Sequence, residues 1–310
     1  MRHSHFNRVD TPSYPPYSDY MAQRLTPYSQ AVLLMLFGIF CFSLMDASAK
    51  YLTGSLGIFM ALWARYTGQS IFVMALVSRE KGVWKAKHPY LQFARSVLLL
   101  SATGFFFASI HALGITKATA LMMLNPVLIT LGGALFLREL LGLQRVIGIA
   151  VSLFGALVII RPGFQEFRVE LIFPVIAAVC YAGYSLVTRF VGHREDVWTS
   201  LLYTGLVGGV LTSLALPFFW VTPTAQDLLV MVAIAGIGTT GQLAVIRSFS
   251  KAEAGAVAPF AYAGLVYAAI LSVLIYRDYP DMWTIFGSIV IGAAGIYVWH
   301  RENKAKRAAL

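Results

Sequence analysis

Long apolar runs, each about the length of a membrane crossing, alternate with short polar connections along the chain. Ten such runs lie at about residues 30–50, 57–78, 92–112, 118–137, 143–161, 170–189, 198–220, 226–247, 254–276 and 282–300. A helix crosses the hydrocarbon core in about 20 residues, so each run predicts a transmembrane helix. The runs are continuously apolar, whereas the strands of a membrane barrel alternate apolar and polar positions. The pattern therefore predicts an all-α integral membrane protein with ten transmembrane helices.

Polar segments flank these runs at both ends of the chain. Residues 1–28 are rich in Pro, Tyr and Ser, a composition typical of disordered chain. They do not resemble a signal peptide, because the first apolar run begins late and no small-residue cleavage site follows it. We expect a disordered cytoplasmic tail over residues 1–28 and a basic cytoplasmic tail over residues 301–310.

The composition agrees with a membrane protein. Of the 310 residues, 58% are apolar and 12% are charged, and the mean hydropathy is +0.71. The charged share is about half that of a soluble domain, too small to cover a soluble surface. The net charge of +10 would suggest nucleic acid in a soluble protein, but here the cations fall mainly between apolar runs. The two cysteines form no CxxC motif, so neither a disulfide framework nor a zinc site is predicted.

The distribution of Lys and Arg predicts the orientation. Eighteen of the 24 Lys and Arg residues lie in the N-terminal segment, the even-numbered connections or the C-terminal segment. Five lie in the odd-numbered connections, and Arg65 lies within a run. Because cytoplasmic loops are enriched in cations, we expect a multi-pass protein of the plasma (inner) membrane with both termini cytoplasmic.

The two halves of the chain show an internal repeat. A shift of 139 residues superimposes several features: Cys41 on Cys180, Lys50 on Arg189, Arg138-Glu139 on Arg277-Asp278, and Gly148 on Gly287. Each copy holds five runs, and an odd number places the second copy upside down in the membrane. We therefore predict two inverted five-helix repeats, over residues 29–163 and 168–300. Inverted repeats are an architecture of secondary transporters, whose substrate site lies near the midplane between the halves.

Four segments resemble one known family. They are "LMDASAKYL" in the first run, "FMALWARYTGQS" in the second, "ALMMLNPVLITLGGALFLREL" in the fourth and "VAPFAYAGLVYAAILSVLIYRDYP" in the ninth. Together they resemble the EamA-type, ten-helix branch of the drug/metabolite transporter (DMT) superfamily, over about residues 30–300. The family usually closes its fourth and ninth helices with Gly-Glu, where this chain has Arg138-Glu139 and Arg277-Asp278. The resemblance implies a carrier of small metabolites such as amino acids, nucleoside-like compounds, vitamins or drugs.

Two charged side chains within the apolar runs are candidates for a functional site. Asp46 lies about five residues from the end of the first run, and Lys50 follows four residues later. The two either form an interfacial pair or leave Asp46 as a buried functional acid. Arg65 lies about eight residues into the second run, too deep to reach water through lipid. Asp46 is its nearest candidate acceptor, either at a functional site or in a permanent structural pair.

Helix interruptions provide further candidates. Asn125-Pro126 lies midway along the fourth run, where proline removes a backbone donor and asparagine adds an amide. Pro259 with Tyr262 marks a similar interruption in the ninth run. Such interruptions in both halves favour a transport site, although Pro126 and Pro259 are not equivalent under the repeat. The alternative is a kink used for helix packing.

Other polar and aromatic positions have simpler interpretations beside functional ones. Four aromatic residues are candidates for a pocket wall, or else face lipid or the core: Trp63, Tyr181, Tyr184 and Tyr267. We expect Gln242 to be interfacial, and His111 and Lys117 to be solvated. The glycines of "AGIGTTGQ" form a GxGxxG pattern without a preceding strand, so we expect them to permit helix packing.

The sequence favours a secondary transporter (permease) over an enzyme, since it contains no HExxH motif, cluster of acids or nucleotide-binding loop. The alternative is a polytopic membrane enzyme or lipid-handling protein. The predicted substrate-binding residues are Asp46, Arg65, Asn125, Tyr184 and Tyr262, with Trp63, Tyr181 and Tyr267 as pocket wall. We expect no catalytic residue, metal or cofactor. The expected partners are a small-molecule substrate and membrane lipid but no nucleic acid, with a proton as candidate coupling ion; exchange or facilitation is equally compatible.

Overall fold

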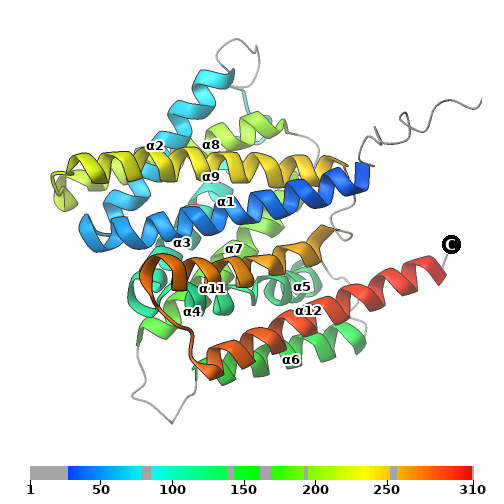
Figure 1. The fold of residues 1–310 in the computed structure, drawn as a ribbon. Coiled ribbons are helices and arrows are strands. Elements are labelled where there is room, and N and C mark those ends of the chain that lie inside the picture. Colours follow the sequence, from blue (N-terminus) through cyan, green and yellow to red (C-terminus); the bar gives the residue numbers. More distant parts are fainter. Residues whose placement is uncertain are drawn as a thin grey trace, which may run out of the picture.

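The structure is a computed structural model that describes residues 27–77, 85–137, 143–160, 169–191, 195–251 and 257–308. Every regular element among these residues is helical (Figure 1). The elements are α1 (Pro27–Ser55), α2 (Ile58–Val77), α3 (Pro89–Leu113), α4 (Ile115–Met122), α5 (Asn125–Leu137), α6 (Leu143–Ile160), η2 (Val169–Leu171), α7 (Ile172–Val191), α8 (Val197–Phe219), α9 (Ala225–Lys251), η4 (Ala258–Tyr262), α11 (Ala263–Tyr276) and α12 (Met282–Ala308). All ten predicted spans are present, which confirms the predicted fold class. Apart from Pro27 and Tyr28, the predicted N-terminal tail lies outside the described residues, as does Arg138-Glu139.

The helices carry apolar side chains on their outer surface and bury polar ones. By length and composition, 5 helices are apolar enough to cross a membrane: Pro27–Ser55, Pro89–Leu113, Val169–Thr188, Val197–Phe219 and Ala225–Ser248. Large apolar side chains such as Leu33, Leu214 and Leu274 are exposed. Several charged and amide side chains, in contrast, are buried in the bundle: Asp46, Arg65, Gln69, Gln92, Arg95, Asp227 and Gln242. This arrangement is the one expected of helices whose surroundings are lipid.

The helix contacts show the symmetry of an inverted repeat. The helix α1 packs on α9, and its counterpart α7 packs on α3. Likewise α2 packs on α9 and α8 on α3, while α1 contacts α11 and α7 contacts α4 and α5. The remaining strong contacts, α2 with α8 and α6 with α12, join each helix to its own counterpart. Figure 1 shows α1 beside α9 above and α6 beside α12 below, and both pairs are in contact.

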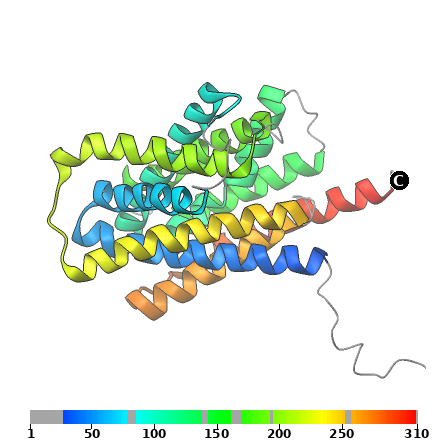
Figure 2. The same ribbon diagram turned by 90° about the horizontal axis from the view of Figure 1, so that it is seen from above.

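Hydrogen bonds and ion pairs place the first, third, seventh and ninth connections at one end of the bundle. Ser55 beside the first connection donates to Asp227 beside the seventh, at 2.9 Å. Gly114 in the third connection lies against Asp278 in the ninth. We call this the odd-turn end. The beginning of α1 and the end of α12 lie together at the opposite end (Figures 1 and 2), as an even number of crossings requires.

The helix interruptions occupy equivalent places in the two repeats. The fourth span is broken between α4 and α5, at Met123 and Leu124. The ninth span begins as the 3-10 helix η4 and becomes α-helical at Ala263. Under the 139-residue shift, Met123 falls on Tyr262 and Leu124 on Ala263. Pro126 and Pro259 are not equivalent under the repeat, as the sequence indicated. The positions at which the helical geometry breaks, however, are equivalent.

Glycines allow the closest helix approaches, as the sequence predicted. A Cβ atom at Gly241 of α9 would lie 2.9 Å from the Cβ atom of Cys41 and 3.0 Å from the carbonyl oxygen of Gly38, both on α1. A Cβ atom at Gly208 of α8 would collide with the ring of Tyr66 on α2. At Gly236, in contrast, a Cβ atom would meet nothing within 4 Å. Backbone contact between α1 and α9 therefore depends on Gly241 and not on Gly236.

A left-handed residue ends α11. Arg277 has φ 52°, and its backbone N–H donates to the carbonyl oxygen of Val273 at 3.0 Å. A left-handed conformation costs a residue other than glycine about 1–2 kcal/mol. Glycine, the usual residue here in the family that the sequence resembles, would avoid this cost. The departure from the family pattern at Arg277-Asp278 is thus accommodated by a strained backbone at the odd-turn end.

We predict that Gly241→Ala lowers the melting temperature of the detergent-purified protein, because the new methyl group collides with the α1 backbone. Gly236→Ala is the matched control on the same helix. It has open space for the methyl group and gains about 1 kcal/mol of helix propensity, so its melting temperature should be unchanged or higher. Equal effects of the two substitutions would contradict the α1–α9 contact described here.

Candidate functional site

Four of the predicted site residues lie close together inside the bundle: Asp46 on α1, Arg65 on α2, and Tyr181 and Tyr184 on α7. Arg65 contacts the sulfur of Met45, the residue that precedes Asp46, and its charge is also near enough to influence the Asp46 carboxyl group and the Tyr181 hydroxyl group. The rings of Tyr181 and Tyr184 lie with their centroids 5.5 Å apart. We call these four residues the central polar cluster.

Asp46 lies deeper than the sequence predicted. The helix α1 continues to Ser55, five residues beyond the predicted end. At 1.5 Å per residue, Asp46 therefore lies about 14 Å from the end of the helix. Its side chain is 8% exposed, and its Oδ1 atom has no hydrogen-bond partner among the described residues. Of the two interpretations of Asp46, the structure supports the buried acid.

Arg65 is buried at a similar depth, about 10 Å from the beginning of α2. It is 7% exposed. One guanidinium nitrogen, Nη1, donates to the sulfur of Met45 at 2.8 Å, and the guanidinium carbon lies 5.5 Å from the centre of the Tyr66 ring. Its Nε atom has no partner within the described part of the chain. The guanidinium is therefore held in place by neutral groups.

Lys50 does not pair with Asp46, which corrects the first interpretation of this segment. Its Nζ atom donates to Asp278 Oδ2 at 2.8 Å, across to the end of α11. The same ammonium lies 4.5 Å from the centre of the Tyr276 ring, whose hydroxyl group donates to the carbonyl oxygen of Ala47 at 2.6 Å. These contacts join α1 to α11 at the odd-turn end, one turn from Asp46.

A second ion pair lies at the same end. Lys117 of α4 lies 3.5 Å from Asp281, at the beginning of α12. The expectation that Lys117 is merely solvated was therefore wrong, because the turn after α11 brings a carboxylate to it. We refer to the pairs Lys50–Asp278 and Lys117–Asp281 as the odd-turn closure.

The sequence analysis missed a buried cation on α3. Arg95 had been counted among the loop cations, but it is 4% exposed. It donates to Thr188 at 2.8 Å, to Gln92 at 3.0 Å and to the Tyr184 hydroxyl group at 3.0 Å. The signal was present in the spacing of Gln92 and Arg95, because residues three apart share one face of a helix. Arg95 thus fixes the Tyr184 ring through its hydroxyl group.

Gln242 also differs from the prediction. It was expected at the interface, but α9 continues to Lys251 and places it nine residues before the helix end. It is 8% exposed, and its Oε1 atom has no partner among the described residues. Gln242 is therefore a further buried polar residue of the bundle.

Three further predicted site residues contact partners outside the central polar cluster. Trp63 donates to Ser213 of α8 at 2.9 Å, in an exposed contact. Tyr267 packs edge-on against the exposed Phe40, with centroids 5.5 Å apart. Tyr262 packs against Gly295 of α12. These three positions therefore line helix interfaces.

Asn125 is the first residue of α5, directly after the break in the fourth span. It is only half-buried, and its Oδ1 atom has no hydrogen-bond partner among the described residues. An amide at a helix break can serve a ligand together with the freed backbone groups.

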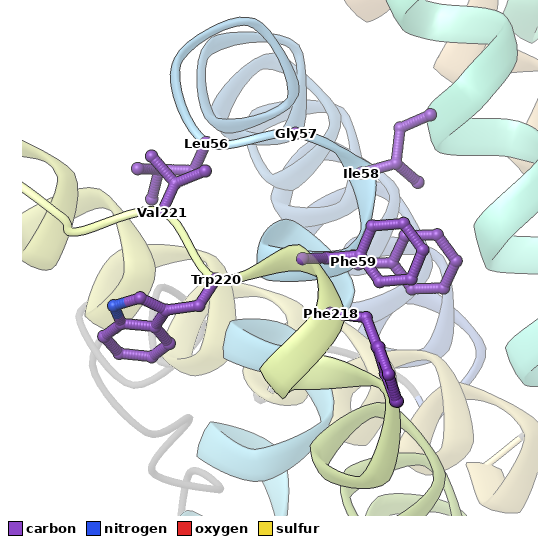
Figure 3. Close-up of a pocket in the computed structure, with 8 residues that line it drawn as sticks. Leu56, Gly57, Ile58, Phe59, Phe218, Trp220 and Val221 are labelled. Carbon is purple, nitrogen blue, oxygen red and sulfur yellow. The ribbon is translucent and has the colours of Figure 1, made fainter.

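A separate hollow of about 310 Å³ lies at the odd-turn end, between the α1–α2 turn and the end of α8. Its lining is apolar and aromatic, with Phe59 stacked on Phe219 at a centroid distance of 3.9 Å. Figure 3 shows Leu56 beside Val221, and Trp220 turned away from the Phe59 ring. Aromatic side chains gather in this way at membrane–water interfaces. The hollow offers no charged side chain to a polar ligand, unlike the central polar cluster.

Comparison with known proteins agrees with this architecture. The sequence model of the EamA-like transporter family matches residues 29–161 and again residues 168–299. The S-adenosylmethionine uptake transporter of Rickettsia bellii is 26% identical over 286 residues, which cover 92% of this chain and 98% of that protein. The pseudopaline exporter of Pseudomonas aeruginosa is 28% identical over 272 residues, which cover 86% of this chain and 94% of that protein.

A third relative and a solved structure extend the comparison. The riboflavin transporter of Vibrio cholerae is 29% identical over 207 residues, which cover 66% of this chain and 68% of that protein. A solved crystal structure matches with a TM-score of 0.63 at 21% identity, covering 87% of this chain and 96% of that one, and shows the same fold. The matched family and the named relatives are transporters, which confirms the prediction of a carrier over an enzyme. The chain belongs to the EamA-like transporter family.

Proposed function

We propose that this protein carries a small polar metabolite across the plasma (inner) membrane by alternating access, with the substrate bound at the central polar cluster. One observation carries the proposal: Asp46 and Arg65 are buried at similar depths on adjoining helices, and each retains a polar atom without a hydrogen-bond partner among the described residues. Charged groups inside a membrane bundle are costly, so they mark substrate or ion pathways. Tyr181 and Tyr184 form the wall of this site.

The inverted repeat provides the two units whose relative movement would expose the site to each side in turn. The repeats over residues 29–163 and 168–300 would rock against each other around the central polar cluster. The equivalent helix breaks before Asn125 and after Tyr262 support this mechanism, because broken helices line the substrate sites of many inverted-repeat transporters. We assign Asn125 and Tyr262 the role of hinge and lining residues rather than of charged substrate contacts.

The odd-turn closure is suited to opening and closing. The side chains of Lys50 and Asp278 are 19% and 45% exposed. A solvated ion pair of this kind is worth at most about 1 kcal/mol. It therefore favours a closed odd-turn end without locking it, as a transporter that alternates between two states requires.

The relatives support a small metabolite as substrate. Their names specify S-adenosylmethionine, riboflavin and pseudopaline. Their names also include both uptake and export, so the similarity fixes neither the substrate nor the direction. Within the predicted range of amino acids, nucleoside-like compounds and vitamins, the buried charges favour an ionic substrate.

Asp46 is the proposed proton site if transport is coupled to a proton. It is an acid buried in a span, and such acids serve as proton relays in pumps and transporters. Exchange of one substrate for another, or simple facilitation, needs no titrating group and remains the alternative. The pH dependence of transport distinguishes these mechanisms.

We predict that Arg65→Ala reduces uptake into proteoliposomes at least about tenfold, because a hydrogen bond to a charged group is worth about 1.5–3 kcal/mol. Asp46→Asn should slow uptake and flatten its dependence on pH. The measurement uses whichever metabolite stabilises the purified protein in a thermal-shift screen. Leu274→Ala, on the exposed surface of α11, is the control. Normal kinetics in Arg65→Ala would return this residue to a purely structural role, and an unchanged pH profile in Asp46→Asn would exclude it as the proton site.

We predict that Lys50→Ala and Asp278→Ala each favour the state that is open at the odd-turn end. The apparent affinity for substrate added on that side should rise on the order of fivefold, as loss of about 1 kcal/mol implies. The double variant should show no further change, and the charge swap Lys50→Asp with Asp278→Lys should restore the original affinity. Lys85→Ala, at the opposite end, is the control. Fully additive effects of the two single substitutions would show that the pair is not coupled.

We predict that the odd-turn end faces away from the cytoplasm and that both termini are cytoplasmic, because the cations gather on the side of the termini. A fluorescent protein fused after Leu310 should fluoresce, and alkaline phosphatase at the same position should be inactive. Phosphatase inserted after Pro223, in the seventh connection, should be active. The reverse pattern would overturn the proposed orientation.

A further inference from the structure

Asp46 and Arg65 are an acid and a base in the same buried site, yet they do not pair with each other. Within the described part of the chain, no ion pair of 4.0 Å or shorter reaches either side chain. Leaving a buried charge uncompensated costs several kcal/mol, so two neighbouring opposite charges would normally close into an ion pair. The backbone and the surrounding contacts hold these two apart.

The contacts of Arg65 explain how this separation is maintained. Its Nη1 atom is occupied by the sulfur of Met45, which packs against Gly238 of α9. The neighbouring Tyr66 hydroxyl group is already engaged, since it donates to Leu99 and bonds to Thr103. These partners orient the guanidinium but supply no negative charge. Arg65 therefore presents a fixed cation, with its Nε atom unpartnered among the described residues.

Asp46 presents the complementary charge. Its Oδ1 atom is buried and unpartnered among the described residues, although the Arg65 charge acts on the carboxyl group. The site thus offers a carboxylate and a guanidinium that are near each other but not in contact. A ligand that neutralises both must carry a positive and a negative group a short distance apart.

We infer that the central polar cluster recognises the head group of an α-amino acid, with the ligand's carboxylate on Arg65 and its ammonium on Asp46. This inference rests on the proposed function and narrows its substrate class. Guanidinium and carboxylate pair through parallel hydrogen bonds, and an ammonium group supplies three donors to a carboxylate. The ammonium and carboxylate groups of an α-amino acid are attached to the same carbon, so one zwitterion between the two side chains can pair with both.

The rest of the ligand faces the aromatic side of the cluster. Tyr181 lies within reach of the Arg65 charge, and its ring neighbours that of Tyr184. The Tyr184 hydroxyl group is occupied by Arg95, so Tyr184 offers its ring rather than its hydroxyl group. These rings favour an uncharged side chain that is apolar or planar.

The test is a binding experiment with head-group analogues, on the full-length protein in detergent. The probes are the natural L-amino acids, followed by the amide and the N-acetyl derivative of each amino acid that binds, with riboflavin and nucleosides as metabolites lacking the head group. For wild type we expect stabilisation by free amino acids. The amide and the N-acetyl derivative should each bind at least about tenfold more weakly, because each loses a charged hydrogen bond.

Two variants assign the contacts. In Arg65→Gln the preference for the carboxylate over the amide should fall below about twofold, while the preference for the free ammonium remains. In Asp46→Asn the opposite should hold, and Leu274→Ala should keep both preferences. Each preference is a ratio of two affinities within one variant, so it is independent of a general loss of stability. Arg65→Lys, which keeps the charge, should retain part of the carboxylate preference.

The possible failures are distinguishable. If riboflavin or a nucleoside binds and is transported but amino acids are not, the head-group inference is overturned and the proposed function stands. Amino acids that bind equally well as amides and N-acetyl derivatives, or variants that keep both preferences, would overturn the inference in the same way. If none of these metabolites binds or enters proteoliposomes, the proposed function at this site fails with it.

Discussion

A charged side chain inside a membrane bundle is costly unless a partner or a bound ligand compensates it. The contacts of the ionisable residues in this bundle follow from that constraint. Lys50 is compensated by the ion pair with Asp278. Arg95 is compensated by hydrogen bonds to neutral acceptors on α3 and α7. Asp46 and Arg65 are only partly compensated, because each has a buried polar atom without a hydrogen-bond partner among the described residues. At the central polar cluster this cost falls on two neighbouring ionisable side chains, and a bound ligand would relieve it.

The scaffold occurs twice, but the charged residues at and beside the central polar cluster occur once. The helix contacts and the breaks in the fourth and ninth spans repeat in both halves. Under the 139-residue shift, however, Asp46 falls on Ser185, Arg65 on Thr204 and Arg95 on Ile234. The first half therefore supplies Asp46, Arg65 and Arg95, and the second supplies the tyrosines of α7. A symmetric scaffold allows the bundle to open at either end, while an asymmetric site allows it to bind one substrate in one orientation.

The sequence was sufficient to predict the architecture, because its signals are local. Run length, cation distribution and the repeat of Cys41 on Cys180 follow from the order of residues alone. The pairing of side chains was harder, since Lys50 has Asp46 as a neighbour four residues away but Asp278 as its partner across the bundle. Helix ends were also underestimated at α1 and α9, which made Asp46 and Gln242 look shallower than they are. Arg95 was missed because it lies within one turn of a predicted helix boundary, where loop cations also occur, and because its shared face with Gln92 was not used.

In the proposed mechanism, the central polar cluster on α1, α2 and α7 becomes accessible from each side of the membrane in turn. Met45 is buried, precedes Asp46 and contacts Arg65. A thiol at this position therefore becomes reactive only when the bundle opens. The direct measurement is alkylation of Met45→Cys, in a protein carrying Cys41→Ala and Cys180→Ala, by a membrane-impermeant reagent applied to each side of sealed vesicles. We expect the thiol to react with reagent added on either side, and the transported substrate should slow both reactions. Reaction from one side only, or reaction that the substrate does not slow, would contradict it.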